Sequence, residues 1–167
     1  MNIITISREF GSGGRELGKR LSDALNVPCY DDEIIEAVAE KHGLSKDYAA
    51  HMSEKDFRAI YPTTIGRRFS GFRYHMHPAT NQSIQFAVAQ QEVIRELAGR
   101  GDCVVVGRCA DVILSDLNPF SLFVYASQES KLARCRSRAK EGEHYTDREI
   151  VQMMRRNDKE RAAYREV

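Results

Sequence analysis

Residues 2–15, which read NIITISREFGSGGR, decide the fold. Residues 2–7 contain the β-branched run Ile3-Ile4-Thr5-Ile6, which is typical of a short buried β-strand. Glycines and a serine fill positions 11–14, and residues 15–25 have the spacing of an amphipathic helix. Glycines let main-chain N–H groups curl around an anion, and a helix N-terminus adds positive dipole. The stretch therefore predicts a polyphosphate site where the first strand passes into the first helix.

The loop differs from the Walker pattern G-x-x-x-x-G-K-[ST]. If Gly13 is the last loop glycine, Gly14 stands in the lysine position. If Gly14 is the last, Arg15 and Glu16 follow it. Both alignments lack the phosphate-binding lysine, so Arg15 is the full charge expected beside the loop. A tight turn without a ligand is an alternative, although the run Gly-Ser-Gly-Gly is longer than a turn needs.

A dinucleotide site is the second alternative. Gly11 and Gly13 fit the first half of the pattern G-x-G-x-x-G, and Asp31 lies where a ribose-binding acid would be expected. The third glycine of that pattern falls on Glu16, so the match is incomplete.

Strands and helices alternate along the rest of the chain. Further strands are predicted at 27–30, 103–106 and 121–126, and the first helix is expected to turn Leu17, Leu21, Ala24 and Leu25 inward. Other helices are predicted after Asp31, over 81–98, at 111–115, after Ser127, and over 147–164 behind a capping box, Thr146-x-x-Glu149. Alternation of this kind predicts right-handed crossovers and a parallel sheet.

Three groups of polar residues each follow a predicted strand. They are residues 8–15 after the first strand, 31–32 after the second, and 107–108 after the third along the chain. Because ligands of parallel α/β sheets bind beyond the carboxyl ends of the strands, we expect these loops to meet at one site.

Composition narrows the class of protein. The 167 residues favour one domain, and 25 Lys and Arg against 24 Asp and Glu give a net charge of +1. That balance argues against a nucleic-acid or membrane partner. The four cysteines form no C-x-x-C pair, so we expect no metal site and a reducing compartment. No signal peptide or membrane span is recognisable, which predicts a cytoplasmic protein and leaves the oligomeric state open.

Four motifs give the chain a resemblance to the cytidylate kinase family, in particular its cytidylate-kinase-like branch. They are ISREFGSGGRE at 6–16, YDDE at 30–33, VVGRCAD at 105–111 and DKER at 158–161. The resemblance implies a three-layer P-loop fold with a central parallel sheet in one domain. It also implies ATP and Mg²⁺ as cofactors, and nucleotide substrates, with transfer of the γ-phosphate to a monophosphate such as CMP. An acceptor-binding segment would span about 41–80, and a lid about 134–146.

The resemblance also implies roles for individual residues. ATP would be bound by the loop and the start of the helix, at Gly11, Ser12, Gly13, Gly14, Arg15 and Glu16. The acceptor would be bound by Asp31, Arg108, Asp158 and Arg161. Arg134 and Arg138, four residues apart on one helix face, would act with Arg15 on the transferring phosphoryl group. The alternative for Arg134 and Arg138 is a solvated basic helix face, for Asp158 and Arg161 an ordinary i, i+3 helix pair, and for Arg108 a surface salt bridge.

The chain departs from the family pattern in three ways. The loop lysine is absent, and the acceptor-site arginine after the second strand is replaced by Glu36. Family members also continue into a final strand and helix, whereas this sequence stops at Val167. Arg67, Arg68 or Arg73 in the middle segment would supply the missing acceptor charge. The lost lysine favours a rival function, a nucleotide-binding module without turnover, and a third candidate is an NAD(P)-binding protein.

Overall fold

The computed structural model describes residues 1–43, 78–139 and 145–163. The chain divides into two compact units, and each is described by itself. Unit 1 comprises Met1–Asp31 with Arg95–Glu166, and unit 2 comprises Asp32–Ile94 with Val167. All the candidate site residues named above except those of the middle segment belong to unit 1.

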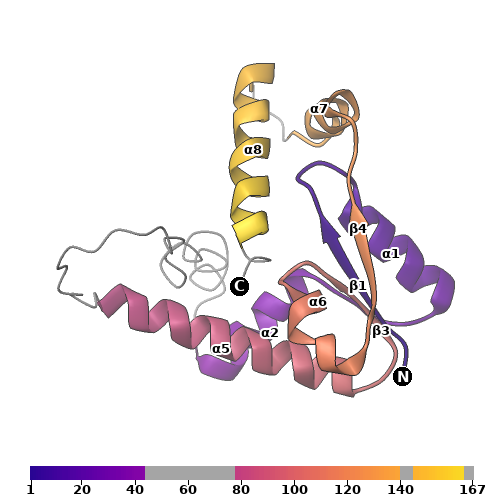
Figure 1. The fold of residues 1–167 in the computed structure, drawn as a ribbon, viewed down its shortest axis with the longest axis vertical. Helices are drawn as coiled ribbons and strands as arrows, with labels where there is room; N and C mark the ends of the chain where they lie inside the picture. Colours follow the sequence, from indigo (N-terminus) through magenta and orange to yellow (C-terminus); the bar gives the residue numbers. More distant parts are fainter. Residues whose placement is uncertain (44–77, 140–144, 164–167) are drawn as a thin grey trace, which may run out of the picture. The chain divides into compact units, whose positions relative to one another are not determined.

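Unit 1 is built on a four-stranded parallel sheet (Figure 1). Its strands are β1 (Ile3–Arg8), β2 (Cys29–Tyr30), β3 (Cys103–Val106) and β4 (Phe120–Val124), in the order β2-β3-β1-β4. Strand β1 is central, because it pairs with β3 over 3–6 and with β4 over 4–8. All four predicted strands and their parallel pairing are confirmed.

Apolar β-branched residues explain why these segments form the sheet. Every residue of β3 is buried, and Ile6, Val104 and Val106 form a core cluster on one sheet face. Leu122 and Val124 of β4 pack against that cluster, and so does Leu21 of the first helix. These buried apolar residues hold the strands in register. Because the strands are parallel, their carboxyl ends lie at the same edge of the sheet.

The helices of unit 1 follow the strands in turn (Figure 1). They are α1 (Gly14–Leu25), α6 (Ala110–Ile113), α7 (Gln128–Ser137) and α8 (Asp147–Ala163), with a 3₁₀ turn at Ser115–Leu117. The Ser127 hydroxyl caps α7 by accepting from the Ser130 amide at 3.3 Å. The predicted capping box at α8 is confirmed: the Thr146 amide donates to the Glu149 carboxylate at 2.8 Å, and the Glu149 amide to the Thr146 hydroxyl at 3.4 Å.

The buried face of α1 differs from the one predicted. Its buried residues are Gly14, Gly18 and Ser22, whereas Leu17 and Leu25 are exposed. The reason is a close approach of helix and sheet: a Cβ at Gly18 would lie 2.6 Å from a methyl carbon of Val106. Side chains as large as leucine do not fit there. The small-residue face holds the start of α1, and with it the glycine-rich loop, against the strand ends.

Replacement of Gly18 by alanine tests this close approach. The change raises helix propensity by up to about 1 kcal/mol, but it forces a methyl group against Val106 in a buried core. Overpacking of this kind costs about 1–3 kcal/mol, so we expect Gly18→Ala to lower the free energy of unfolding in urea. Gly99→Ala is the matched control, since a Cβ at Gly99 would meet nothing within 4 Å. Equal stability of both variants would contradict the close approach.

Unit 2 contributes α2 (Asp32–His42) and most of α5 (Pro78–Gly99), whose last five residues, 95–99, fall in unit 1. The helix predicted after Asp31 is confirmed, and its apolar residues Ile34, Ile35 and Val38 are buried. Lys41 of α2 pairs with Glu92 of α5 at 3.6 Å. Residues 44–77, which include Arg67, Arg68, Arg73 and most of the expected acceptor segment, lie outside the described residues. The single-domain organisation stays a prediction.

Across the three described ranges, no helix is both long and apolar enough to cross a membrane.

Candidate functional site

The glycine-rich loop links the end of β1 to the start of α1. Its first turn is closed by Ser12, whose hydroxyl and amide both donate to the main-chain oxygen of Glu9, at 2.9 and 3.4 Å. Gly13 is the N-cap residue of α1 and has φ 91°, a left-handed conformation that favours glycine. The first amides of a helix lack partners within the helix, so the start of α1 presents donors suited to an anion.

Arg8, the last residue of β1, joins the carboxyl ends of three strands. Its guanidinium group lies against Gly107, directly after β3, where an added Cβ would be 2.7 Å from Cζ. Its Cβ is 2.7 Å from the position that a Cβ of Gly14 would take. Nη2 also lies 3.5 Å from Oδ1 of Asp31, directly after β2. The predicted convergence of three loops is therefore observed, and Arg8 is the residue at its centre.

Positive charge is concentrated around Arg8. Burial chiefly, and then the neighbouring charges of Arg161, Arg108 and Arg15, lower the pKa of Arg8 to about 10, while Asp31 opposes them. The pKa of Arg161 is lowered as well, first by burial and then by Arg108 and Arg15, against the opposing effect of Asp158 and Asp31. Arginines in such numbers at a partly buried edge are suited to a polyanion.

Asp31 is the acid of this cluster. Its side chain is 9% exposed, and Nε of Arg15 donates to Oδ2 at 2.5 Å. The expected acceptor residue Asp31 and the expected ATP-binding residue Arg15 therefore lie in direct contact. Arg15 is 58% exposed, so its guanidinium group remains accessible from solvent.

Helix α8 places Asp158 and Arg161 against the loop. Oδ1 of Asp158 accepts a hydrogen bond from the Phe10 amide at 2.6 Å. Nη1 of Arg161 donates to the main-chain oxygen of Arg8 at 3.2 Å, and its guanidinium carbon lies 5.9 Å from the centre of the Phe10 ring. These two residues therefore do more than form a pair on the helix surface, because both contact the end of β1 and its loop.

Arg134 and Arg138 reach the same turn of α1. Arg134 donates to Oε2 of Glu16 at 2.7 Å, and Arg138 donates to the same oxygen at 3.1 Å. The Arg134 guanidinium carbon also lies 3.0 Å from the position of a Cβ at Gly13. Arg20 donates to Oε1 of Glu16, and chiefly its charge lowers the Glu16 pKa. The carboxylate of Glu16 thus holds the expected lid arginines beside the loop.

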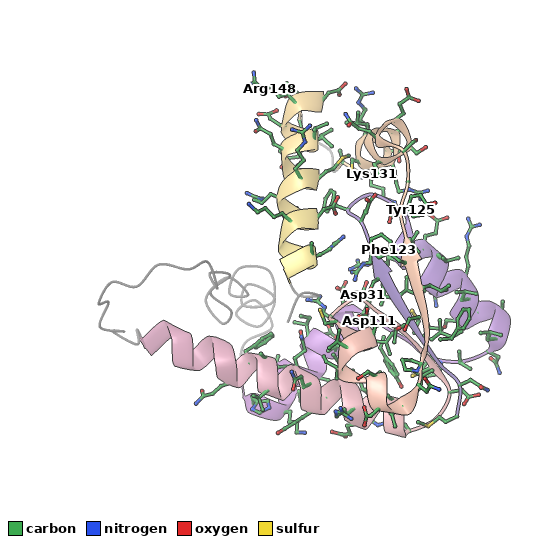
Figure 2. The ribbon with its side chains drawn as sticks, in the orientation of Figure 1. Asp31, Asp111, Phe123, Tyr125, Lys131 and Arg148 are labelled. Carbon is green, nitrogen blue, oxygen red and sulfur yellow. The ribbon has the colours of Figure 1, made fainter. Side chains whose placement is uncertain are left out.

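Arg108 follows β3 in a tight bend. Arg108 and Cys109 both have left-handed conformations, with φ of 56° and 52°. This is a sparsely populated region for residues other than glycine, and such conformations are concentrated at functional sites. The bend brings Arg108 close enough to Arg8 and Arg161 for its charge to lower the pKa of both. Asp111 follows in the first turn of α6 (Figure 2).

Sequence reasoning included Arg8 and Glu9 in the loop at 8–15 but gave neither a role of its own, and it missed Lys131. A role for Arg8 could have been found: when Gly13 is taken as the last Walker glycine, Arg8 occupies the position of the first. Lys131 of α7 lies 3.0 Å from Oε2 of Glu9 and is 13% exposed. Its sequence context, one basic residue near the start of a polar helix, contains no sign of this contact.

A parallel sheet with a glycine-rich loop after its central strand and arginines at its carboxyl edge defines the P-loop kinase class of fold. The chain belongs to the cytidylate kinase-like family, whose model matches residues 3–166. No functionally curated protein gives a significant match.

Two solved structures are similar to the chain. One is an uncharacterized protein from Eubacterium ventriosum ATCC 27560, with 27% identity and a TM-score of 0.61 over 98% of this chain and 75% of the other. A shikimate kinase from Bacteroides thetaiotaomicron shares the fold at 18% identity and a TM-score of 0.51, over 96% of this chain and 80% of its own. The fold class and family predicted from sequence are confirmed.

Proposed function

We propose that the protein is a nucleotide kinase, which transfers the γ-phosphate of ATP to a nucleoside monophosphate, with CMP or dCMP as the favoured acceptor. Membership of the cytidylate kinase-like family supports the reaction class. The observation that carries the proposal is the cluster of positive charge at the strand ends. There the charges of Arg15 and Arg108 lower the pKa of both Arg8 and Arg161, and Asp31 opposes them. The triphosphate of ATP and the phosphate of the acceptor, brought together, would supply the negative charge that these arginines neutralise.

The residues at the site fit both ATP and Mg²⁺. The loop amides and Arg15 would bind the phosphates of ATP, and a side chain at Gly13 would intrude on Arg134. In the described ranges no three His, Cys, Asp or Glu side chains are grouped to hold a metal. Mg²⁺ in kinase sites keeps several waters and is bound largely through substrate phosphates. It would supply charge neutralisation on the transferring phosphoryl group.

The chemistry needs no general base. The second pKa of a phosphate monoester is about 6, so an acceptor oxygen is largely ionised at neutral pH. That oxygen attacks the γ-phosphorus, the bond to the β–γ bridging oxygen breaks, and ADP leaves with the negative charge. Arg108 and Arg161 would orient the acceptor phosphate, and Arg134 with Arg138 would stabilise the charge spread over the phosphoryl oxygens. A lid closing over the site would exclude water.

The experiment that tests this function is coupled phosphotransfer from ATP with a panel of nucleoside monophosphates. We expect ADP formation that depends on the acceptor, with CMP or dCMP as the best substrate. Calorimetric ATP binding without transfer to any acceptor would instead favour the second candidate, a binding module without turnover. That candidate is favoured by one observation, namely that glycine or arginine replaces the loop lysine. NADH binding that ATP does not displace would favour the third, an NAD(P)-binding protein.

We expect Arg15→Ala and Arg108→Ala each to lower kcat/KM at least about tenfold, because a hydrogen bond from a charged group contributes about 1.5–3 kcal/mol. Arg15→Ala is expected to act through KM for ATP, and Arg108→Ala through KM for the monophosphate. Steady-state kinetics with each substrate varied in turn measures this. Arg100→Ala is the control, since Arg100 directly follows α5 and forms an exposed ion pair with Glu96. Wild-type rates in both site variants would contradict the assignment of Arg15 to ATP binding and of Arg108 to acceptor binding.

A further inference from the structure

Lys131 of α7 lies against the glycine-rich loop (Figure 2). Its Cβ is 3.3 Å from the position of a Cβ at Gly11, so the two segments touch. Nζ lies 3.0 Å from Oε2 of Glu9 and 3.8 Å from Oδ2 of Asp158. Only 13% of the side chain is exposed. A lysine ammonium group is strongly hydrated, so placing it in this position requires the two carboxylates as partners.

Asp158 is bound here in the manner of an oxyanion. Oδ1 accepts from the Phe10 amide of the loop at 2.6 Å, while Oδ2 faces Nζ of Lys131. One anionic group is thus held between a loop amide and an ammonium group. Phosphate-binding loops use the same pair of donors, since main-chain amides surround the phosphate and a lysine supplies the charge.

We propose that the Phe10 amide and Lys131 form a phosphate-oxygen subsite of the glycine-rich loop, which the Asp158 carboxylate occupies until a nucleoside triphosphate displaces it. In this arrangement Lys131 supplies from α7 the lysine that the loop sequence lacks. The inference rests on the proposed function and deepens it, because it names the cation for the ATP phosphates. Displacement also frees Asp158, one of the residues expected to bind the acceptor, so triphosphate binding would prepare the acceptor site.

The competition predicts changes of opposite sign at the two residues. Lys131→Met removes a charged donor, so we expect ATP and inorganic pyrophosphate to bind at least about tenfold more weakly. Asp158→Asn removes the competing charge and keeps the shape, so we expect both ligands to bind several-fold more tightly. A purely structural tie between α7, the loop and α8 predicts no tightening. A role of Asp158 in acceptor binding alone, without the competition, predicts weaker acceptor binding with unchanged ATP affinity.

Isothermal titration calorimetry of the full chain with inorganic pyrophosphate and with ATP provides the test. Lys19→Met and Asp116→Asn are the matched controls, because they make the same chemical changes in exposed surface pairs with Asp23 and Arg95. We expect both controls to bind like the wild type. If Lys131→Met fails to fold, the sign of the Asp158→Asn effect decides by itself, with Lys131→Arg as the variant that retains the charge.

Two results would overturn the subsite: unchanged or weaker binding of both ligands by Asp158→Asn, or unchanged binding by Lys131→Met. Failure of the proposed function looks different, because the wild type would then bind ATP without transferring phosphate to any acceptor. Wild-type pyrophosphate binding that Lys131→Met loses would support the subsite even if no acceptor were found.

Discussion

Arg8→Met is expected to reduce ATP binding on the order of 100-fold while leaving the ligand-free protein at least as stable as the wild type. The first effect follows from position, because the Arg8 guanidinium group lies between Gly107 and the start of α1 and faces Asp31. Truncating a buried charged group at a binding interface typically costs 2–5 kcal/mol or more. That range corresponds to roughly 30-fold or more in the dissociation constant.

The second effect follows from electrostatics. Lowering the Arg8 pKa from its ordinary value to about 10 corresponds to roughly 3 kcal/mol against the charged form in the folded state. Because the folded pKa lies below the unfolded one, the charged side chain opposes folding at every pH below about 10. Methionine fills a similar volume without the charge. Asp31 keeps its contact with Arg15 at 2.5 Å, so its carboxylate stays partnered in the variant.

Urea denaturation of the ligand-free protein and ATP calorimetry measure the two effects separately. Arg100→Met serves as the control, because Arg100 forms an exposed pair with Glu96 four residues away. It is expected to change neither measurement beyond the small contribution of a surface pair. A variant that loses stability and binding together would mean that Arg8 is chiefly a structural residue.

The fold was predictable because its signals are local. A run such as residues 103–106, CVVV, can only be a buried strand or the middle of a buried helix, and its length and branching decide for the strand. Once strands and helices alternate, the handedness of crossovers leaves a parallel sheet, and the polar residues after each strand must meet at one edge. The structure confirms the strands, the caps at Ser127 and Thr146, and the meeting of the loops.

The buried face of α1 was not predictable from apolar periodicity. The pattern Leu17, Leu21, Ala24, Leu25 indicates one face, but the helix turns its glycines to the sheet. The distance between α1 and the sheet decides which face is buried, and that distance depends on tertiary packing, which apolar periodicity does not show. At Gly18 the separation is too small for any side chain, so the leucines are displaced to the flanks and only Leu21 reaches the core cluster.

The candidate site also contains some residues that local sequence predicts and one contact that only tertiary packing determines. Residues next to a strand end, such as Asp31 and Arg108, follow from the motif order and from sheet geometry. The contact of Lys131 with Glu9 does not, because it joins positions 122 residues apart in the chain. The packing of α7 on the loop determines it, and no local pattern in a helix reading QESKLARCRS encodes its partner.

Gly13→Ala is expected to lower kcat/KM for ATP by at least about 100-fold. Gly13 is the N-cap of α1 at φ 91°, and an alanine there would suffer backbone strain of about 1–2 kcal/mol. Its Cβ would also lie 3.0 Å from Cζ of Arg134 and 3.2 Å from both terminal nitrogens. The methyl group would therefore displace the guanidinium group proposed to stabilise the transferring phosphoryl. Misplacement of catalytic groups by about 1 Å can cost about 100-fold in rate.

Strain and intrusion can be separated with a second glycine. Gly43 also has a left-handed conformation, at φ 63°, but a Cβ there would meet nothing within 4 Å. Gly43→Ala should therefore show the strain alone, as a modest loss of stability with unchanged kinetics. If Gly13→Ala loses stability to the same extent and keeps its activity, the loop conformation is not what binds the nucleotide. If it loses activity far beyond its stability change, and if Arg134→Met shows a similar fall in kcat, then the contact between the loop and the lid arginine is the element that catalysis requires.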